Sequence, residues 1–153
     1  MTCTIYVQAP PDFTPRVEVA SCYCTWEEKL LLLQRHPLKS HGNTWGVPAG
    51  KLEEDEDPPS ALVREMWEEI GFAIEKEHLE AIKTLYIRDS KDFIYHMFYL
   101  SLDTEPAINL GLMEHQDFRW ATVDQALQMH LMPGEHETLE FYRSFLQGKQ
   151  LRL

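Results

Sequence analysis

The sequence is poor in positive charge, in cysteine and in long apolar runs. Its 14 Lys and Arg residues stand against 25 Asp and Glu residues, which gives a formal net charge of −11. Proteins that bind long nucleic acids neutralise many phosphates with basic side chains, so this charge balance argues against that class of function. A small polyphosphate that brings its own metal ion remains compatible with it.

No apolar run approaches the roughly 18 residues that a membrane-spanning helix needs, and the N-terminus lacks a basic region followed by a long apolar stretch. We therefore expect a soluble, unexported protein of the cytoplasm that does not bind a membrane. Cys3, Cys22 and Cys24 are an odd number, without a second pair to complete a zinc site. They are expected to be reduced and to pack as small apolar side chains.

The length of 153 residues favours a single domain, residues 1–153, around one core. Alternation in residues 16–24 predicts a half-buried strand. The apolar run 30–35 predicts a second strand, covered on both faces and paired with the first through a turn at 26–29. Similar patterns predict further strands at 85–88, 93–100 and 118–121, a short helix at 123–129 and a closing helix at 135–146.

A third helix is predicted for residues 58–70. Asp57 or Ser60 is suited to cap its first N–H groups, prolines are tolerated in the first turn, and Gly71 accepts the left-handed conformation that ends many helices. Leu62, Val63, Met66 and Ile70 form its apolar stripe. Strands with helices on two sides indicate an α/β/α sandwich.

Acidic residues are concentrated in and before this helix. Residues 53–69 contain eight acids and one Arg. Glu65, Glu68 and Glu69 have spacings that place them on one helical face, where like charges repel unless a cation neutralises them. Such all-oxygen sites suit Mg²⁺ or Mn²⁺. The alternative, a solvated acidic helix face, is the usual explanation of a charge run.

The spacing from Gly50 to Phe72 resembles the Nudix box of the Nudix (MutT-like) hydrolases. All of its fixed positions are filled, by Gly50, Glu56, Arg64, Glu65, Glu68, Glu69 and Gly71. The looser aliphatic positions hold Met66 and Phe72. The resemblance implies the α/β/α sandwich of that family, with a mixed central sheet, and a monomer or homodimer.

The resemblance also implies roles for the box residues. Glu68 and Glu69 would bind the metal ion with the Ala49 carbonyl, and Glu56 would assist. Glu65 would be a further ligand, or would orient or deprotonate water. Arg64 is four residues before Glu68, which suits a salt bridge that fixes the carboxylate; contact with phosphate is the second alternative.

Outside the box, relatives use a Glu from a loop before a late strand, and Glu114 is the candidate here, as a catalytic group or a surface carboxylate. Arg35 would contact phosphate or base, or form an ordinary ion pair. Trp45 would border the substrate or anchor the core. Residues 132–136 lack the Asn that reads the purine in enzymes destroying oxidised dGTP. Glu135 stands there instead, as a substrate-binding candidate.

These observations predict a Mg²⁺-dependent enzyme that hydrolyses a phosphoanhydride bond of a nucleoside triphosphate or another nucleoside diphosphate-linked compound. Such chemistry needs charge neutralisation and placement of water more than covalent work by the protein. A dinucleoside polyphosphate hydrolase is the nearest alternative. A catalytically silent nucleotide-sensing module is a further one, because a fold does not dictate function.

Overall fold

The computed structural model describes residues 3–151. Its strands are β1 Thr4–Tyr6, β2 Pro15–Trp26, β3 Lys29–Arg35, β4 Trp45–Gly46, β5 Ala49–Lys51, β6 Glu80–Arg88, β7 Asp92–Leu102 and β8 His115–Ala121. Its helices are α1 Pro58–Ile70, the 3₁₀ turn η1 Lys76–His78, α2 Val123–Ala126 and α3 Glu135–Leu151. Among the helices of this described part, none is long and apolar enough to cross a membrane.

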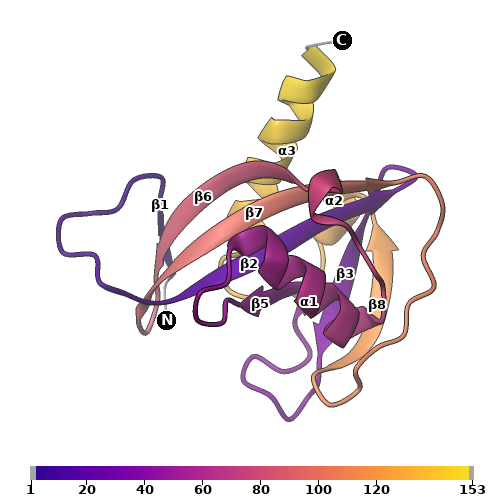
Figure 1. Cartoon of the computed structure of the whole chain (residues 1–153), viewed down its shortest axis with the longest axis horizontal. Coiled ribbons are helices and arrows are strands. Elements are labelled where there is room, and N and C mark those ends of the chain that lie inside the picture. Colours follow the sequence, from indigo (N-terminus) through magenta and orange to yellow (C-terminus); the bar gives the residue numbers. More distant parts are fainter. Residues whose placement is uncertain (1–2, 152–153) are drawn as a thin grey trace.

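The strands form one mixed sheet. The order is β1-β6-β7-β2-β3-β4, with β5 paired to β2 and β8 paired to β3. The long central pair β2 and β7 is parallel, and the pairs around it are antiparallel. Helix α1 crosses one face of the sheet, and α3 packs on the other (Figure 1). The expected α/β/α sandwich with a mixed sheet is confirmed.

The core lies in two layers, one on each face of the sheet. Leu30 and Leu32 pack with Tyr142 of α3 on one face, whereas Leu31 and Leu33 pack with Met66 of α1 on the other. All four leucines are at most 1% exposed. The prediction of a strand covered on both faces is therefore confirmed, because consecutive strand side chains point to opposite faces.

The predicted turn between β2 and β3 is also confirmed. Glu27 and Glu28 both have positive φ angles, 49° and 63°, which is the conformation that two-residue hairpins favour because it matches strand twist. The prediction of a half-buried β2 is wrong for its second half. Residues 20–25 are all buried, since β2 lies at the centre of the sheet with helices on both sides.

Element lengths differ from the predictions at several ends. Strand β6 begins at Glu80 rather than residue 85, β7 runs from Asp92 to Leu102, and β8 begins at His115. Helix α2 ends at Ala126 instead of 129, although its predicted cap Thr122 forms a capping box with Gln125. Helix α3 continues to Leu151. The strands β1, β4 and β5 and the turn η1 were not predicted.

Candidate functional site

Helix α1 presents the box acids because both of its ends are fixed. Oδ1 of Asp57 accepts a hydrogen bond from the backbone N–H of Ser60 at 2.9 Å, and Pro58 and Pro59 open the helix. Gly71 ends it in the left-handed conformation, with φ of 65°. The predicted helix and both predicted caps are confirmed, so the acids have a rigid support.

Strand β5 forms the surface beneath one of these acids. Gly50 pairs with Ala20 of β2, and a Cβ atom at position 50 would collide with the carboxylate of Glu65. Glycine is needed here for close approach, since any other residue would displace α1 or its side chain. Burial raises the pKa of Glu65, and a hydrogen bond from Arg64 opposes that rise.

Arg64 holds the acids of the box together. Its Nε and Nη2 donate to the two carboxylate oxygens of Glu56 at 3.0 and 2.9 Å. Its Nη1 donates to Glu65 at 2.8 Å and to Glu68 at 3.2 Å, and Nη2 also donates to the Lys51 carbonyl at 3.0 Å. The expected bridge to Glu68 is present. The hydrogen bond from Arg64 also holds the pKa of Glu56 below its usual range.

Glu69 is the most buried acid of the box. It is 5% exposed, and its Oε2 has no hydrogen-bond partner among the described residues. Burial raises its pKa well above the usual range, and the nearby charges of Glu65 and Glu114 raise it further. A backbone hydrogen bond from Ala49 opposes this shift. A buried carboxylate with an unpartnered oxygen is costly unless something binds it.

Glu114 approaches the box from the loop before β8. The N–H of Gly111 donates to the Glu69 carbonyl at 2.9 Å, and the N–H of Glu114 donates to Gly111 at 3.1 Å. The N–H of His36 donates to the Glu114 carbonyl at 2.8 Å. A cavity of about 260 Å³ results, lined by Glu65, Glu68, Glu69 and residues 111–114. The structure thus brings Glu114 beside three of the predicted metal ligands.

The donors around this cavity suit a hard divalent cation, because all of these acids offer carboxylate oxygens and Oε2 of Glu69 is unpartnered. Within residues 3–151, no three acidic, His or Cys side chains are arranged to hold a metal ion as they stand. Arg64 instead draws Glu56, Glu65 and Glu68 toward itself. Ion binding therefore requires Glu68, whose side chain is 55% exposed, to turn from Arg64.

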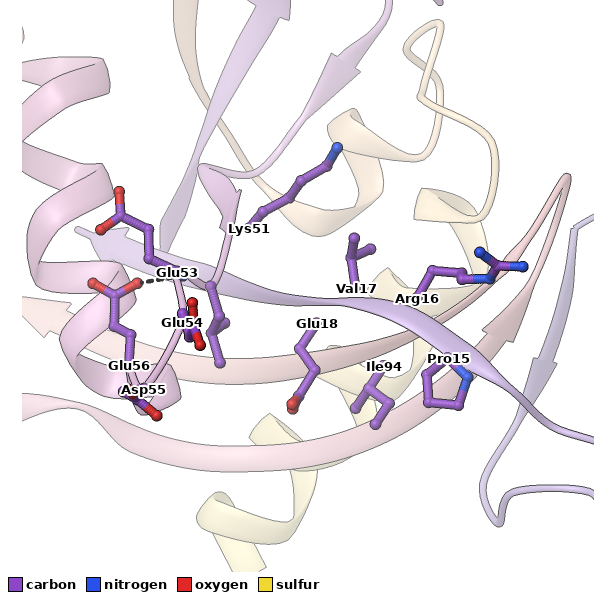
Figure 2. A pocket seen from close by; sticks show the side chains of 11 residues that line it. Pro15, Arg16, Val17, Glu18, Lys51, Glu53, Glu54, Asp55, Glu56 and Ile94 are labelled. Atoms are coloured by element: carbon purple, nitrogen blue, oxygen red, sulfur yellow. Dashed lines mark hydrogen bonds between the residues drawn. The ribbon is translucent and has the colours of Figure 1, made fainter.

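An open groove of about 530 Å³ lies on the outer side of the box loop (Figure 2). Glu18 of β2 and Glu54 of the loop line it, and the N–H of Glu53 donates to Glu56 beside it at 2.9 Å. The loop acids 53–55 are exposed, as expected at unconstrained box positions. This acidic lining repels polyphosphate, which favours the cavities at β5 for an anionic substrate.

Glu135 lies in a different cavity, on the α3 side of the sheet. It is the first residue of α3 and only 7% exposed. Its Oε1 accepts from the N–H of Val47 at 2.9 Å, and its Oε2 accepts from the Thr138 hydroxyl at 2.8 Å. Burial raises the pKa of Glu135, and these two hydrogen bonds oppose the rise. Ala49 borders this cavity of about 210 Å³.

The other two predicted substrate residues lie apart from these groups. Trp45 is 7% exposed in the α3-side core, with the guanidinium carbon of Arg119 4.9 Å from its ring centre. This is the position of a core anchor. Arg35 ends β3 as predicted, pairs with His115 of β8, and donates from Nε to the Ser40 carbonyl at 2.9 Å.

Sequence reasoning missed three contributors to these sites. The Lys51 carbonyl binds Arg64, the Val47 N–H binds Glu135, and the Thr138 hydroxyl binds the same carboxylate. Backbone groups leave no sequence signal at such positions. Thr138 had one, because it follows Glu135 by three residues in the first turn of a helix, where side chains meet.

Comparisons with known proteins agree with this geometry. A family model described as NUDIX domain matches residues 15–145. The CTP pyrophosphohydrolase of Escherichia coli K12 is 30% identical over 129 residues, which cover 82% of this chain and 90% of that protein.

Solved structures give the same result. The E. coli ORF135 protein matches with a TM-score of 0.70 and 28% identity, over 84% of this chain and 89% of that chain. An Ap4A hydrolase of C. elegans, in a binary complex, matches with a TM-score of 0.62 and 26% identity, over 86% and 98%. The family model spans well over half of the chain, and the chain therefore belongs to the Nudix hydrolase family.

Proposed function

We propose that the protein is a Mg²⁺-dependent pyrophosphohydrolase that cleaves a nucleoside triphosphate to a nucleoside monophosphate and pyrophosphate. The observation that carries this proposal is the unpartnered, buried Oε2 of Glu69 in a cavity shared with Glu65, Glu68 and Glu114. Such an arrangement costs stability in the free protein, which a bound cation would recover. The similarity to a CTP pyrophosphohydrolase supports a nucleotide as substrate.

In this proposal Glu68, Glu69 and the Ala49 carbonyl hold the ion, and Glu65 can join them. Mn²⁺ would serve in place of Mg²⁺. A bound cation supplies neutralisation of the polyphosphate charge and stabilises the leaving phosphate. Glu56 acts chiefly on Arg64, because both of its oxygens accept from that guanidinium.

The protein's own side chains handle the water and the proton. Water attacks phosphorus, the P–O anhydride bond breaks, and its electron pair leaves with pyrophosphate. The proton of the water passes to a carboxylate, for which Glu65 and Glu114 are the candidates on either side of the cavity. Arg64 positions Glu65 and Glu68 through its Nη1.

The remaining predicted residues contribute to substrate binding in this proposal. Arg35 lies beside the loop of Glu114, where its charge can attract phosphate. Glu135 lines the cavity that meets the carboxylate site at Ala49. Trp45 supports the neighbouring Gly46 and Val47, which line the same cavity, from within the core.

The test is turnover of a panel of nucleoside triphosphates with Mg²⁺, read by release of pyrophosphate. We expect Glu69→Gln to lower the rate by at least about a hundredfold. Glu54→Gln, which alters an exposed acid of the same loop, is the matched control and should retain the rate. A panel without turnover, or a Glu69→Gln variant as active as the wild type, would refute the proposal.

A dinucleoside polyphosphate hydrolase is the second candidate, favoured by the 26% identity to an Ap4A hydrolase over 86% of this chain. Product analysis separates the two. A triphosphatase releases monophosphate and pyrophosphate, whereas the alternative enzyme releases two nucleotides from a dinucleotide. Chromatography of the products from CTP and from Ap4A, at equal concentrations, decides between them.

A further inference from the structure

The cavity that contains Glu135 is built for a small planar group. Its walls include the apolar side chains of Val47, Phe93 and Met132, and Gly46 adds no side chain to them. At about 210 Å³ it is smaller than the roughly 300–1,000 Å³ that drug-sized ligands fill. It therefore suits one ring system of a substrate rather than a whole nucleotide.

The cavity is connected to the carboxylate site through one residue. Ala49 lines the cavity, and the same residue gives the backbone hydrogen bond to Glu69. A ring bound on the α3 side of β5 would thus lie one strand residue away from Gly50, on which Glu65 packs. A nucleoside triphosphate can span such a path with its base at one end and its phosphates at the other.

Glu135 is held rigidly inside this cavity. The Val47 N–H fixes one carboxylate oxygen and the Thr138 hydroxyl fixes the other. Each oxygen has two acceptor sites, so each retains one for a ligand. Because the group is 7% exposed, water does not compete freely for these sites, and a donor that meets them gains more than it would at the surface.

The polarity of the carboxylate then discriminates among bases. An exocyclic amino group offers N–H donors, which a carboxylate accepts, whereas a carbonyl in the same place presents a second acceptor and would be left unpaired. Leaving a buried polar group unpaired costs more than one good hydrogen bond gains. Tyr95 and Thr138 extend the polar end of the cavity, and the remaining wall excludes water.

We propose that Glu135 selects nucleotides whose base carries an exocyclic amino group, by accepting its N–H in the cavity between β5 and α3. This inference rests on the proposed function, because it takes the base of the hydrolysed nucleotide as the occupant. The shared chemistry is the amino group of cytosine, adenine or guanine, and uracil lacks it.

The test compares pairs of triphosphates that differ at this group: CTP with UTP, ATP with ITP, and GTP with ITP. In at least one pair we expect kcat/KM to favour the amino base by about tenfold or more, and the pair that shows it names the base. In Glu135→Gln an N–H donor replaces one acceptor, so this preference should fall at least about threefold. Glu140→Gln, an exposed acid of the same helix, should keep it.

Binding of the monophosphate products separates this inference from the proposed function. Calorimetry with CMP, UMP, AMP, GMP and IMP needs neither turnover nor metal. Preferred binding of an amino base that Glu135→Gln loses supports the inference even if no triphosphate is hydrolysed. Turnover without the tenfold preference in any pair, or a preference that Glu135→Gln retains, overturns it while the proposed function stands. Absence of both turnover and selective binding overturns both.

Discussion

Gly50 lies so close to the carboxylate of Glu65 that a side chain at position 50 has no room. Strand β5 and helix α1 are therefore held at a separation that only glycine permits. The contact sets the position of Glu65 relative to the backbone of Ala49, which in turn bonds to Glu69. The geometry of the acidic site depends on this one missing side chain.

Gly50→Ala is therefore expected to displace Glu65 and to lower nucleotide turnover at least about tenfold. Forced repacking should also reduce the free energy of unfolding by about 1–3 kcal/mol, measured by urea titration. Gly148→Ala is the matched control, because a Cβ there meets no atom within 4 Å. In helix α3 it should stabilise the protein by about 0.5–1 kcal/mol and leave turnover unchanged. Full activity in Gly50→Ala would contradict this account.

Arg64→Lys should lower kcat by about tenfold or more while the protein stays folded. A lysine cannot reproduce the two parallel hydrogen bonds that Arg64 makes to Glu56 at 3.0 and 2.9 Å. Arg88→Lys removes a comparable pair, at 2.8 and 3.1 Å to Asp92, far from the acids in the β6–β7 hairpin. Steady-state kinetics of both variants should show a loss only for Arg64. Equal losses would mean that the effect is not local.

Glu69→Gln should make the metal-free protein more stable but less responsive to Mg²⁺. The substitution removes a buried carboxylate whose pKa is raised by burial and by the charges of Glu65 and Glu114. Mg²⁺ at a hundred times its Kd would stabilise the wild type by about 2.7 kcal/mol. Urea midpoints with and without Mg²⁺ measure both effects. Glu54→Gln should respond as the wild type does, and an undiminished Mg²⁺ response in Glu69→Gln would exclude Glu69 as a ligand.

The pH dependence of stability should carry a contribution from Glu135. Its pKa is raised above the ordinary value of 4.5, so above that pH the folded protein keeps a proton that the unfolded chain has lost. The free energy of unfolding then falls as pH rises through this window. Glu135→Gln lacks this group, and its stability should decline less with pH.

Urea titrations of the wild type and Glu135→Gln at several pH values from 4.5 upward check this slope. Glu69 has a raised pKa as well, but it is present in both proteins, so its contribution cancels in their difference. Parallel curves for the two proteins would show that Glu135 exchanges no proton on unfolding.

The sequence predicted well those elements whose causes are local. Helix α1 has a capping Asp57, an apolar stripe and a terminal Gly71 within its own span, and each acts as expected. Strand β3 has a continuous apolar run. The strands β1 and β5 have three residues each, which is too few to display a period of two.

Errors in element length also have physical reasons. Strand β8 begins early at His115, where a register shift opposite Gln34 and Arg35 interrupts the alternation that would have revealed it. Helix α3 runs past its last inward residues because Gly148 meets no obstacle and nothing there stops the helix. Such ends are set by tertiary contacts more than by composition.

At the site, the spacing of Glu65, Glu68 and Glu69 was sufficient to place them together on α1. It could not reveal that Arg64 would bind three acids at once, since Glu56 reaches it from the loop. The arrival of Glu114 beside Glu69 depends on backbone bonds of a distant loop. Its role as a neighbour came from the family resemblance, whereas its position came from the fold.

The shared position of Ala49 separates recognition from reaction. On one side of this residue lies the chamber around Glu135, and on the other lie the acids of α1. Met132 and Phe93 could thus be exchanged to redirect the enzyme toward other compounds while its hydrolytic apparatus stays intact. The fold is in this sense modular, with a single peptide unit as the partition.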